Sequence, residues 1–221
     1  AELYPAARLA AVALPVRTVG VQGDCRSYKA AVALSTAPPD PADPASVAAV
    51  LDWAALFAVA RRVPSESPAI SRTVFMFGPP LDPTADATAT ATAVASASTA
   101  SASAVSASAV TETRCTREVM DQLRAADRVV TEVMLKHGLE HTLSQVPVVL
   151  FPASFGTAGA RSVAIRPFIT RDFMTGTPAV PGVDIPFAAV EEMVRGILAV
   201  PGVARVVYDL TSKPPGTTEW E

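Results

Sequence analysis

The residues best suited to hold a ligand lie at the end of the chain, in the segment Ser212–Glu221, which reads SKPPGTTEWE. Two prolines stiffen the backbone just after Lys213, a glycine allows a turn, and two threonines supply hydroxyl and amide groups. Such a segment holds a cation and polar donors in a fixed geometry, which suits an anionic ligand such as phosphate. The alternative is a rigid tail in which Trp220 merely packs.

A second candidate lies in a turn, where Asp24 and Arg26 flank Cys25. In a functional interpretation Arg26 binds phosphate, and Asp24 orients a sugar hydroxyl or a partner arginine. In the alternative, both side chains face solvent. Cys25 is not expected to be a nucleophile, because a catalytic cysteine needs a base and neither histidine is indicated as its partner.

Other sequence patterns exclude some chemistry. His137–His141 matches the His-x-x-Glu-His metalloprotease string, but Gly138 interrupts the helix that would place both imidazoles on one face. We therefore interpret the string as a chance match and predict no metal site. The chain also lacks Gly-x-Gly-x-x-Gly, the Walker loop and the Ser-Gly-Gly-x-Asp-Ser loop of ATP pyrophosphatases. We expect a segment that binds an anion and performs no chemistry alone.

The elements that position the second candidate, the polar turn around Cys25, are β-rich. Thr18–Gln22 and Tyr28–Leu34 are predicted to be strands on either side of the polar turn. A helix is expected from Ser46, its N-cap, to Pro64, which should stop it. Thr73–Phe77 then reads as a buried strand.

The C-terminal half is expected to alternate helices and strands before the tail. Apolar residues at helical spacing mark the two helices, and short apolar runs mark the strands. In order, these are a helix from Thr116 to Gly138, strands Val146–Phe151 and Ser162–Ile169, a helix Pro186–Val200 and a strand Val203–Leu210.

A faint internal repeat relates the two halves. Strand, helix and strand follow one another in Tyr28–Phe77 and again in Arg161–Leu210, with similar spacing. The sequence therefore predicts an α+β fold with two copies of a small strand-helix-strand unit, in antiparallel sheets covered by helices. We expect a first dimerisation-like unit over residues 1–80, and a helix plus a second unit with the ligand-binding tail over 114–221.

Residues 81–113 separate these units and are predicted to be a disordered insert. Alanine there alternates with threonine or serine, which offers too little apolar surface to offset the entropy of an ordered chain.

Charge and composition argue against several partners. A net charge of −3 and a pI near 5.5 indicate no nucleic-acid footprint and no membrane-surface patch, and no run approaches a membrane span. Two distant cysteines suggest free thiols in a reducing compartment. The chain begins at Ala1, which suggests a fragment or a processed product. A soluble, cytosolic protein is expected.

Three ordered motifs carry a family resemblance. Val19–Tyr28, Asp172–Thr175 and Tyr208–Glu221 resemble motifs of the C-terminal domain of glutamine-hydrolysing GMP synthetase, a domain that binds XMP and mediates dimerisation. Ser144–Val148 resembles the longer eukaryotic-type form. In bacterial members the second strand leads almost directly into the middle motif, whereas a long stretch intervenes here.

The resemblance implies a substrate and a set of site residues. Lys213 and Arg26 would contact the XMP phosphate, and Asp24, Gln145 and Glu219 would complete the nucleotide pocket. In the whole enzyme, an N-terminal glutaminase and an ATP pyrophosphatase domain would act with this part, and ATP and Mg²⁺ would activate XMP for amination to GMP. This fragment alone would carry no cofactor and no catalytic residue.

The resemblance also implies an assembly. Bacterial members dimerise through this domain, so the chain is expected to form a homodimer or, through its two copies, an intramolecular pseudo-dimer. A different interpretation is a non-catalytic interaction module that kept the fold and lost the enzyme. A third is an unrelated α+β scaffold, which would bind no purine nucleotide.

Overall fold

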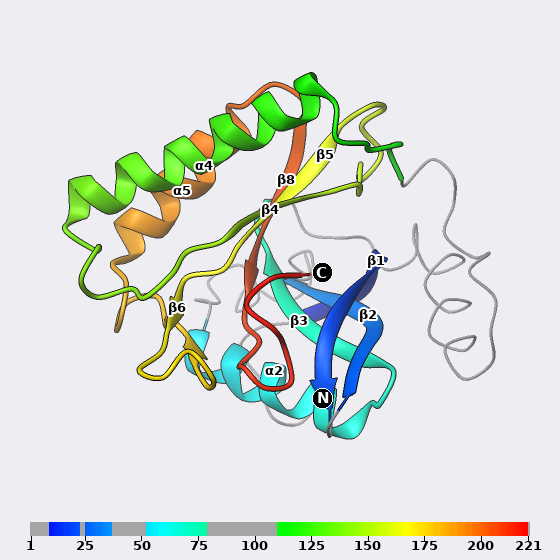
Figure 1. The fold of residues 1–221 in the computed structure, drawn as a ribbon, viewed down its shortest axis with the longest axis vertical. Helices are drawn as coiled ribbons and strands as arrows, with labels where there is room; N and C mark the ends of the chain where they lie inside the picture. Colours follow the sequence, from blue (N-terminus) through cyan, green and yellow to red (C-terminus); the bar gives the residue numbers. More distant parts are fainter. Residues whose placement is uncertain (1–8, 23–24, 37–51, 79–109, 221) are drawn as a thin grey trace, which may run out of the picture.

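The computed structural model describes residues 9–22, 25–36, 52–78 and 110–220. Within them, helices and strands form one mixed six-stranded sheet, a small two-stranded sheet and a layer of helices (Figure 1). The elements are β1 (Leu9–Gln22), β2 (Cys25–Thr36), α2 (Trp53–Glu66), β3 (Ile70–Met76), α4 (Arg117–His137), β4 (Val148–Phe151), β5 (Arg161–Ile165), β6 (Phe168–Ile169), β7 (Thr177–Pro178), α5 (Phe187–Leu198) and β8 (Val203–Asp209).

The strand order of the large sheet is β1-β2-β3-β8-β5-β4. The first three strands of the chain form one half, and β4, β5 and β8 form the other half in the mirrored order. Two antiparallel outer pairs, β1–β2 and β4–β5, flank two parallel pairs, β2–β3 and β5–β8, and the central pair β3–β8 is antiparallel. Phe75 lies directly opposite Tyr208 at the centre. The predicted repeat is therefore visible as two strand-strand-helix-strand halves related by a local two-fold axis.

The α+β class is confirmed, but the pairing within each copy differs from the expected antiparallel sheets. Each helix, α2 or α5, returns the chain in its original direction, and such a crossover makes the two connected strands parallel. Both copies also contain the same irregularity. The ladder passes over Ser71, just before Arg72, in the first copy, and over Ala204, just before Arg205, in the second.

Both faces of the sheet are buried. Along β2, Val32 and Leu34 point into a large core, whereas Ala31 and Ala33 point into a smaller one, as the two-residue period of a strand dictates. The large core packs against α2, α4 and α5, with α4 and α5 side by side (Figure 1). On the opposite face, Trp220 of the tail closes the smaller core.

The helix boundaries agree with the sequence at α4 and differ at α2. Thr116 caps α4 and Gly138 ends it at φ 64°, as predicted. Pro64 does not stop α2, which continues to Glu66. A proline in a last turn removes a single helical hydrogen bond, so the helix continues past it. The N-cap of α2 is Asp52, and the predicted start at Ser46 lies outside the described residues.

Most of the predicted insert, residues 81–109, also lies outside the described residues, so its disorder stays a prediction. The chain resumes at Val110, and the amide of Thr111 donates to the carbonyl of Pro152 at 2.8 Å. None of the helices in the described ranges has the length and apolar character that crossing a membrane requires.

Candidate functional site

The C-terminal tail, residues 211–220, leaves β8 and runs back past β3 and β1 (Figure 1). Two backbone hydrogen bonds fix it to β1: the amide of Val21 donates to the carbonyl of Pro215 at 2.7 Å, and that of Val19 donates to Trp220 at 2.8 Å. The Lys213–Pro214 and Pro214–Pro215 peptide bonds are cis. The tail is thus an ordered arch on the sheet rather than a free end.

Beneath this arch lies an ionic cluster of Arg72, Arg166 and Asp209, whose side chains are 0% exposed. Asp209 Oδ2 accepts from Arg72 Nη1 at 2.7 Å, from Arg166 Nη1 at 2.9 Å and from Trp220 Nε1 at 2.9 Å. Its Oδ1 accepts from the Thr211 amide at 2.9 Å. One carboxylate therefore joins both strands of the central pair to both ends of the tail.

The cluster shifts the pKa values of its members. Burial alone would raise the pKa of the Asp209 carboxyl, but the charges of Arg166 and Arg72, together with hydrogen bonds from Thr211, lower it below its ordinary value. Burial lowers the pKa of the Arg166 guanidinium, against the opposing effect of Asp209. Two guanidinium groups around one carboxylate leave a buried excess of positive charge under the tail.

This cluster was not among the predicted site residues, although the sequence contains a signal for it. Arg72 and Asp209 stand inside or at the ends of strongly apolar strand sequences, where charged residues are almost never buried unless they are paired. Arg166 directly follows the buried strand β5 in the same way. Opposite charges in or next to three apolar strands could have indicated an internal ion pair. They could not have indicated which arginine contacts which part of the tail.

Lys213 sits at the outer side of the arch, half-buried, and connects the tail to the loop before β7. Its Nζ donates to the carbonyl of Phe173 at 2.7 Å and to Thr218 Oγ1 at 3.2 Å. Its backbone exchanges two hydrogen bonds with Gly176, at 3.0 and 2.9 Å. An ammonium has three N–H donors, and the described residues supply acceptors for two of them, so the third can donate to a ligand.

The loop that receives Lys213 is shaped by Asp172. This carboxylate accepts from the amides of Met174 and Thr175 and from the Thr175 hydroxyl. The Thr175 amide is the main reason that the pKa of Asp172 is lowered. Phe173 adopts φ 56° in this loop. Asp172 thereby sets the direction of the carbonyl that accepts from Lys213.

Gln145 belongs to the same neighbourhood through the small sheet. It pairs with Phe168 of β6, whose amide donates to the Gln145 carbonyl at 2.9 Å. Phe168 pairs in turn with Pro178 of β7, and Gly176, just before β7, pairs with Lys213. The structure therefore brings Gln145 and Lys213 to opposite sides of one narrow ribbon.

The remaining candidates are less closely joined. Glu219 has an exposed side chain, and its carbonyl accepts from Arg72. Arg26 is exposed on β2 opposite Val21, whose amide is bonded to the tail at Pro215. Asp24 lies outside the described residues. The structure thus places Glu219 within the arch and Arg26 on the strand beside it, and leaves Asp24 as a sequence prediction.

The His-x-x-Glu-His string and the two cysteines form no site among the described residues. Gly138 ends α4 at the second position of the His-x-x-Glu-His string, so His137 and His141 do not share a helix. Among the described residues, no group of three or more His, Cys, Asp or Glu side chains could hold a metal ion. Cys25 and Cys115 are free and exposed.

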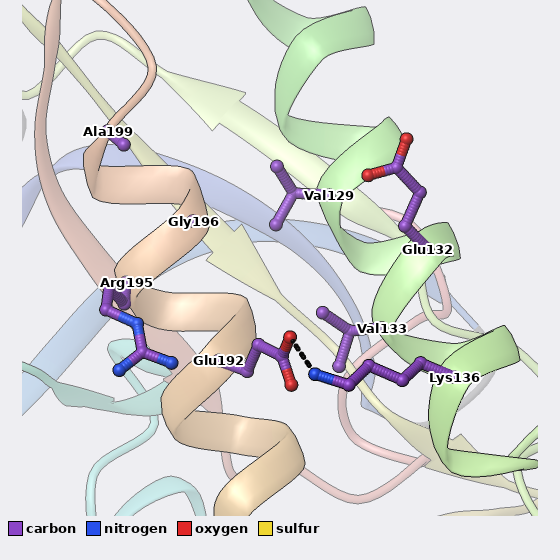
Figure 2. Close-up of a pocket in the computed structure, with 8 residues that line it drawn as sticks. All are labelled: Val129, Glu132, Val133, Lys136, Glu192, Arg195, Gly196 and Ala199. Carbon is purple, nitrogen blue, oxygen red and sulfur yellow. Dashed lines mark hydrogen bonds and ion pairs between the residues drawn. The ribbon is translucent and has the colours of Figure 1, made fainter.

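A hollow of about 450 Å³ lies elsewhere, between α4 and α5. Figure 2 shows Glu192 of α5 and Lys136 of α4 meeting across it at 2.7 Å, with Val129 close to Gly196. A Cβ atom at Gly196 would come within 2.5 Å of Val129 Cγ1, so this glycine lets the helices approach. The hollow contains none of the predicted ligand residues, and we interpret it as a feature of helix packing.

Comparison with known proteins supports the resemblance. The model of a family described as the GMP synthase C terminal domain matches residues 4–80 and 132–220. The chain is 41% identical over 210 residues to the glutamine-hydrolyzing GMP synthase of Dictyostelium discoideum, and 34% identical over 231 residues to the probable glutamine-hydrolyzing GMP synthase of Caenorhabditis elegans.

The extent of these matches differs between relatives. The two eukaryotic matches cover 95% and 97% of this chain, whereas the chain spans only 27% of each relative's length. A glutamine-hydrolyzing GMP synthase of Thermus thermophilus is 41% identical over 113 residues, which cover 48% of this chain and 22% of the relative. The resemblance seen in the three motifs is confirmed, and the chain belongs to the family of the GMP synthase C-terminal domain.

Proposed function

We propose that this chain is the XMP-binding C-terminal part of a glutamine-hydrolysing GMP synthase. In the complete enzyme, a glutaminase domain supplies ammonia, and an ATP pyrophosphatase domain uses ATP and Mg²⁺ to activate XMP for amination to GMP. No ATP-binding loop occurs in the present sequence, so ATP and Mg²⁺ are assigned to the other domains. The chain itself contributes substrate binding and assembly.

The observation that carries this proposal is the fixed ammonium of Lys213. Two acceptors, the Phe173 carbonyl and the Thr218 hydroxyl, orient the group, and its third N–H is available for a phosphate oxygen. A preordered cation loses little entropy when it binds an anion, because its side chain is already immobilised. Arg26 is proposed as the second phosphate ligand.

The other proposed ligands are Gln145, Glu219 and Asp24, of which Asp24 lies outside the described residues. Gln145 reaches the arch through β6, Glu219 stands near its end, and Asp24 precedes the strand that carries Arg26. Their side chains would bind the ribose and the base, which need donors and acceptors rather than a net charge. This assignment accounts for all five residues without a catalytic group.

The assembly that the topology favours is an intramolecular pseudo-dimer. The two halves of the sheet meet at the antiparallel β3–β8 pair, as two subunits of a symmetric dimer would. A homodimer of complete chains would add a second interface outside this sheet. The exposed free thiols fit a cytosolic location, which we include in the proposal.

Isothermal titration of the complete enzyme with XMP and with xanthosine tests the function. Xanthosine has the same base and ribose but no phosphate, so it should bind at least tenfold more weakly, the loss of one charge-assisted hydrogen bond. Equal affinity would refute the phosphate role of the tail. Failure of XMP to bind at all would refute the function.

A further inference from the structure

We propose that Arg72 is a positioning residue for the nucleotide site, through which the first copy holds the tail of the second in its binding geometry. The inference rests on the proposed function, because Lys213 and Glu219 of that tail are the proposed ligands. Arg72 itself is fully buried and would touch no substrate. Its role is to fix the path of the tail.

The guanidinium of Arg72 contacts both the carboxylate and the end of the tail. Nη1 donates to Asp209 Oδ2 at 2.7 Å, and Nη2 donates to the carbonyl and the hydroxyl of Thr217 at 2.9 and 3.0 Å. Nη2 also donates to the carbonyl of Glu219. The two N–H groups of Nη2 are shared among these acceptors and the Val19 carbonyl at 3.3 Å, while Nη1 binds Asp209, a planar arrangement that a single ammonium does not provide.

The start of the tail is held by the same carboxylate. Thr211 donates its amide to Asp209, and its hydroxyl exchanges hydrogen bonds with the backbone of Thr73, next to Arg72. Lys213 lies between these two anchored ends. The distance between these two anchored ends therefore decides where the Lys213 ammonium can lie. Arg72 contributes to both ends, because it binds Asp209, which holds the start, and Thr217, which lies near the end.

The local two-fold axis shows that this arrangement exists only once in the part of the chain that the structure describes. The axis passes through the Phe75–Tyr208 pair at the centre of the ladder, with Val74 paired to Asp209 on one side and Met76 to Val207 on the other. Residues at equal distances along the two strands are therefore equivalent. Arg72 corresponds to Arg205, and Asp209 corresponds to Met76. Met76 is uncharged, so the matching position has no carboxylate to pair with a guanidinium. One nucleotide site per chain follows, with Arg72 from the first copy and the carboxylate and tail from the second.

The substitution Arg72→Lys in the complete enzyme tests the inference, with Arg205→Lys as the matched control. A lysine retains the charge near Asp209 but loses the fork to Thr217 and Glu219. We expect Arg72→Lys to raise the Kd for XMP at least tenfold, the value of one charge-assisted hydrogen bond. Arg205→Lys should stay within about twofold. An Arg72→Lys Kd within twofold of the unmodified enzyme would overturn the inference.

A double-mutant cycle separates positioning from general destabilisation. If Arg72 acts through the tail, the loss in the double variant Arg72→Lys and Lys213→Ala should be smaller than the product of the two single losses, because the ammonium that Arg72 positions is already absent. If the fold-increase in the Kd for XMP of the double variant equals the product of the two single increases, the inference is contradicted.

Thr217→Val provides a second variant in case Arg72→Lys does not fold. It removes one Arg72 acceptor and should weaken XMP binding by about threefold or more. Unchanged binding would count against the positioning role. Absence of XMP binding by the unmodified enzyme would instead refute the proposed function itself, so the two failures are distinguishable.

Discussion

The Lys213 ammonium donates to the carbonyl oxygen of Phe173 at 2.7 Å, across a gap of forty residues in sequence. This bond joins the tail to the loop shaped by Asp172, two of the three motifs that mark the family. A ligand bound by Lys213 therefore contacts a cation whose direction is set by a second segment. The bond also makes Lys213 the most informative position to change.

Lys213→Ala in the complete enzyme should weaken XMP binding about 10- to 150-fold, because one charge-assisted hydrogen bond is worth roughly 1.5–3 kcal/mol. Lys213→Arg should recover part of the loss, since a planar fork does not replace a compact ammonium between two fixed acceptors. Isothermal titration measures both variants. ATP affinity serves as the control and should hardly change. XMP affinity within twofold of the unmodified enzyme would show that Lys213 is only a packed tail residue.

Asp209→Asn should lower the free energy of unfolding by about 3–5 kcal/mol, because it leaves two buried guanidinium groups without their carboxylate. The melting temperature should fall by roughly 10 °C, which calorimetry can measure. The isosteric change isolates the loss of charge from a change in volume. A fall of less than about 2 °C would mean that the cluster contributes little to stability.

The same variant carries a pH dependence. The pKa of Asp209 is lowered in the folded protein below its ordinary value of 3.8, so the unfolded chain binds more protons in the interval between the two values. The stabilising effect of the charge is present above pH 3.8 and is lost as the pH falls through the lower, folded pKa. The stability difference between the unmodified protein and Asp209→Asn should therefore shrink in this acid range. A difference that grew on acidification would contradict the direction of the shift.

Gly20→Ala should disturb the arch from the side of β1. A Cβ atom there would lie 3.0 Å from the carbonyl oxygen of Pro215 and 3.0 Å from the Cβ of Ser71. Because neither atom is the end of a flexible side chain, the tail must shift, at a cost of about 1–3 kcal/mol. We expect a lower melting temperature together with weaker XMP binding. If only the melting temperature changes, the shift at Pro215 does not reach Lys213.

Replacing residues 85–109 by a glycine-serine linker of the same length should leave the melting temperature within about 2 °C. Alanine, serine and threonine offer little apolar surface, so little burial can be lost. Equal length keeps the connection between the halves unchanged. A fall beyond about 4 °C would show that the natural sequence packs against the domain.

Patterns with a local cause were predictable from the sequence. The cap at Thr116 and the left-handed Gly138 followed from the preferences of helix ends, and the repeat followed from order and spacing. The end of α2 did not follow, because the effect of Pro64 depends on how many turns remain after it. Lys213, Asp24 and Arg26 stood out by their residue chemistry, whereas Gln145 and Glu219 followed from the family resemblance. That Gln145 and Lys213 lie on opposite sides of the small sheet could be seen only in the structure.

The ionic cluster could not be derived in the same way. Arg72 and Asp209 are separated by 137 positions, and their contact depends on which strands pair at the centre of the sheet. The repeat alone does not settle that question, because two copies can also form separate sheets. A buried charge in an apolar strand predicts that a partner exists but not where it lies in the chain.

The palindromic order of the sheet has a consequence for the behaviour of the protein on dilution. Where such halves belong to separate chains, the central strand pair forms by association, and folding then depends on protein concentration. Here a covalent connection holds β3 and β8 in one molecule, so their encounter is set by the effective concentration of a tethered segment. The sheet, and the arch built on its central pair, would then remain assembled at concentrations at which a subunit interface of the same size dissociates.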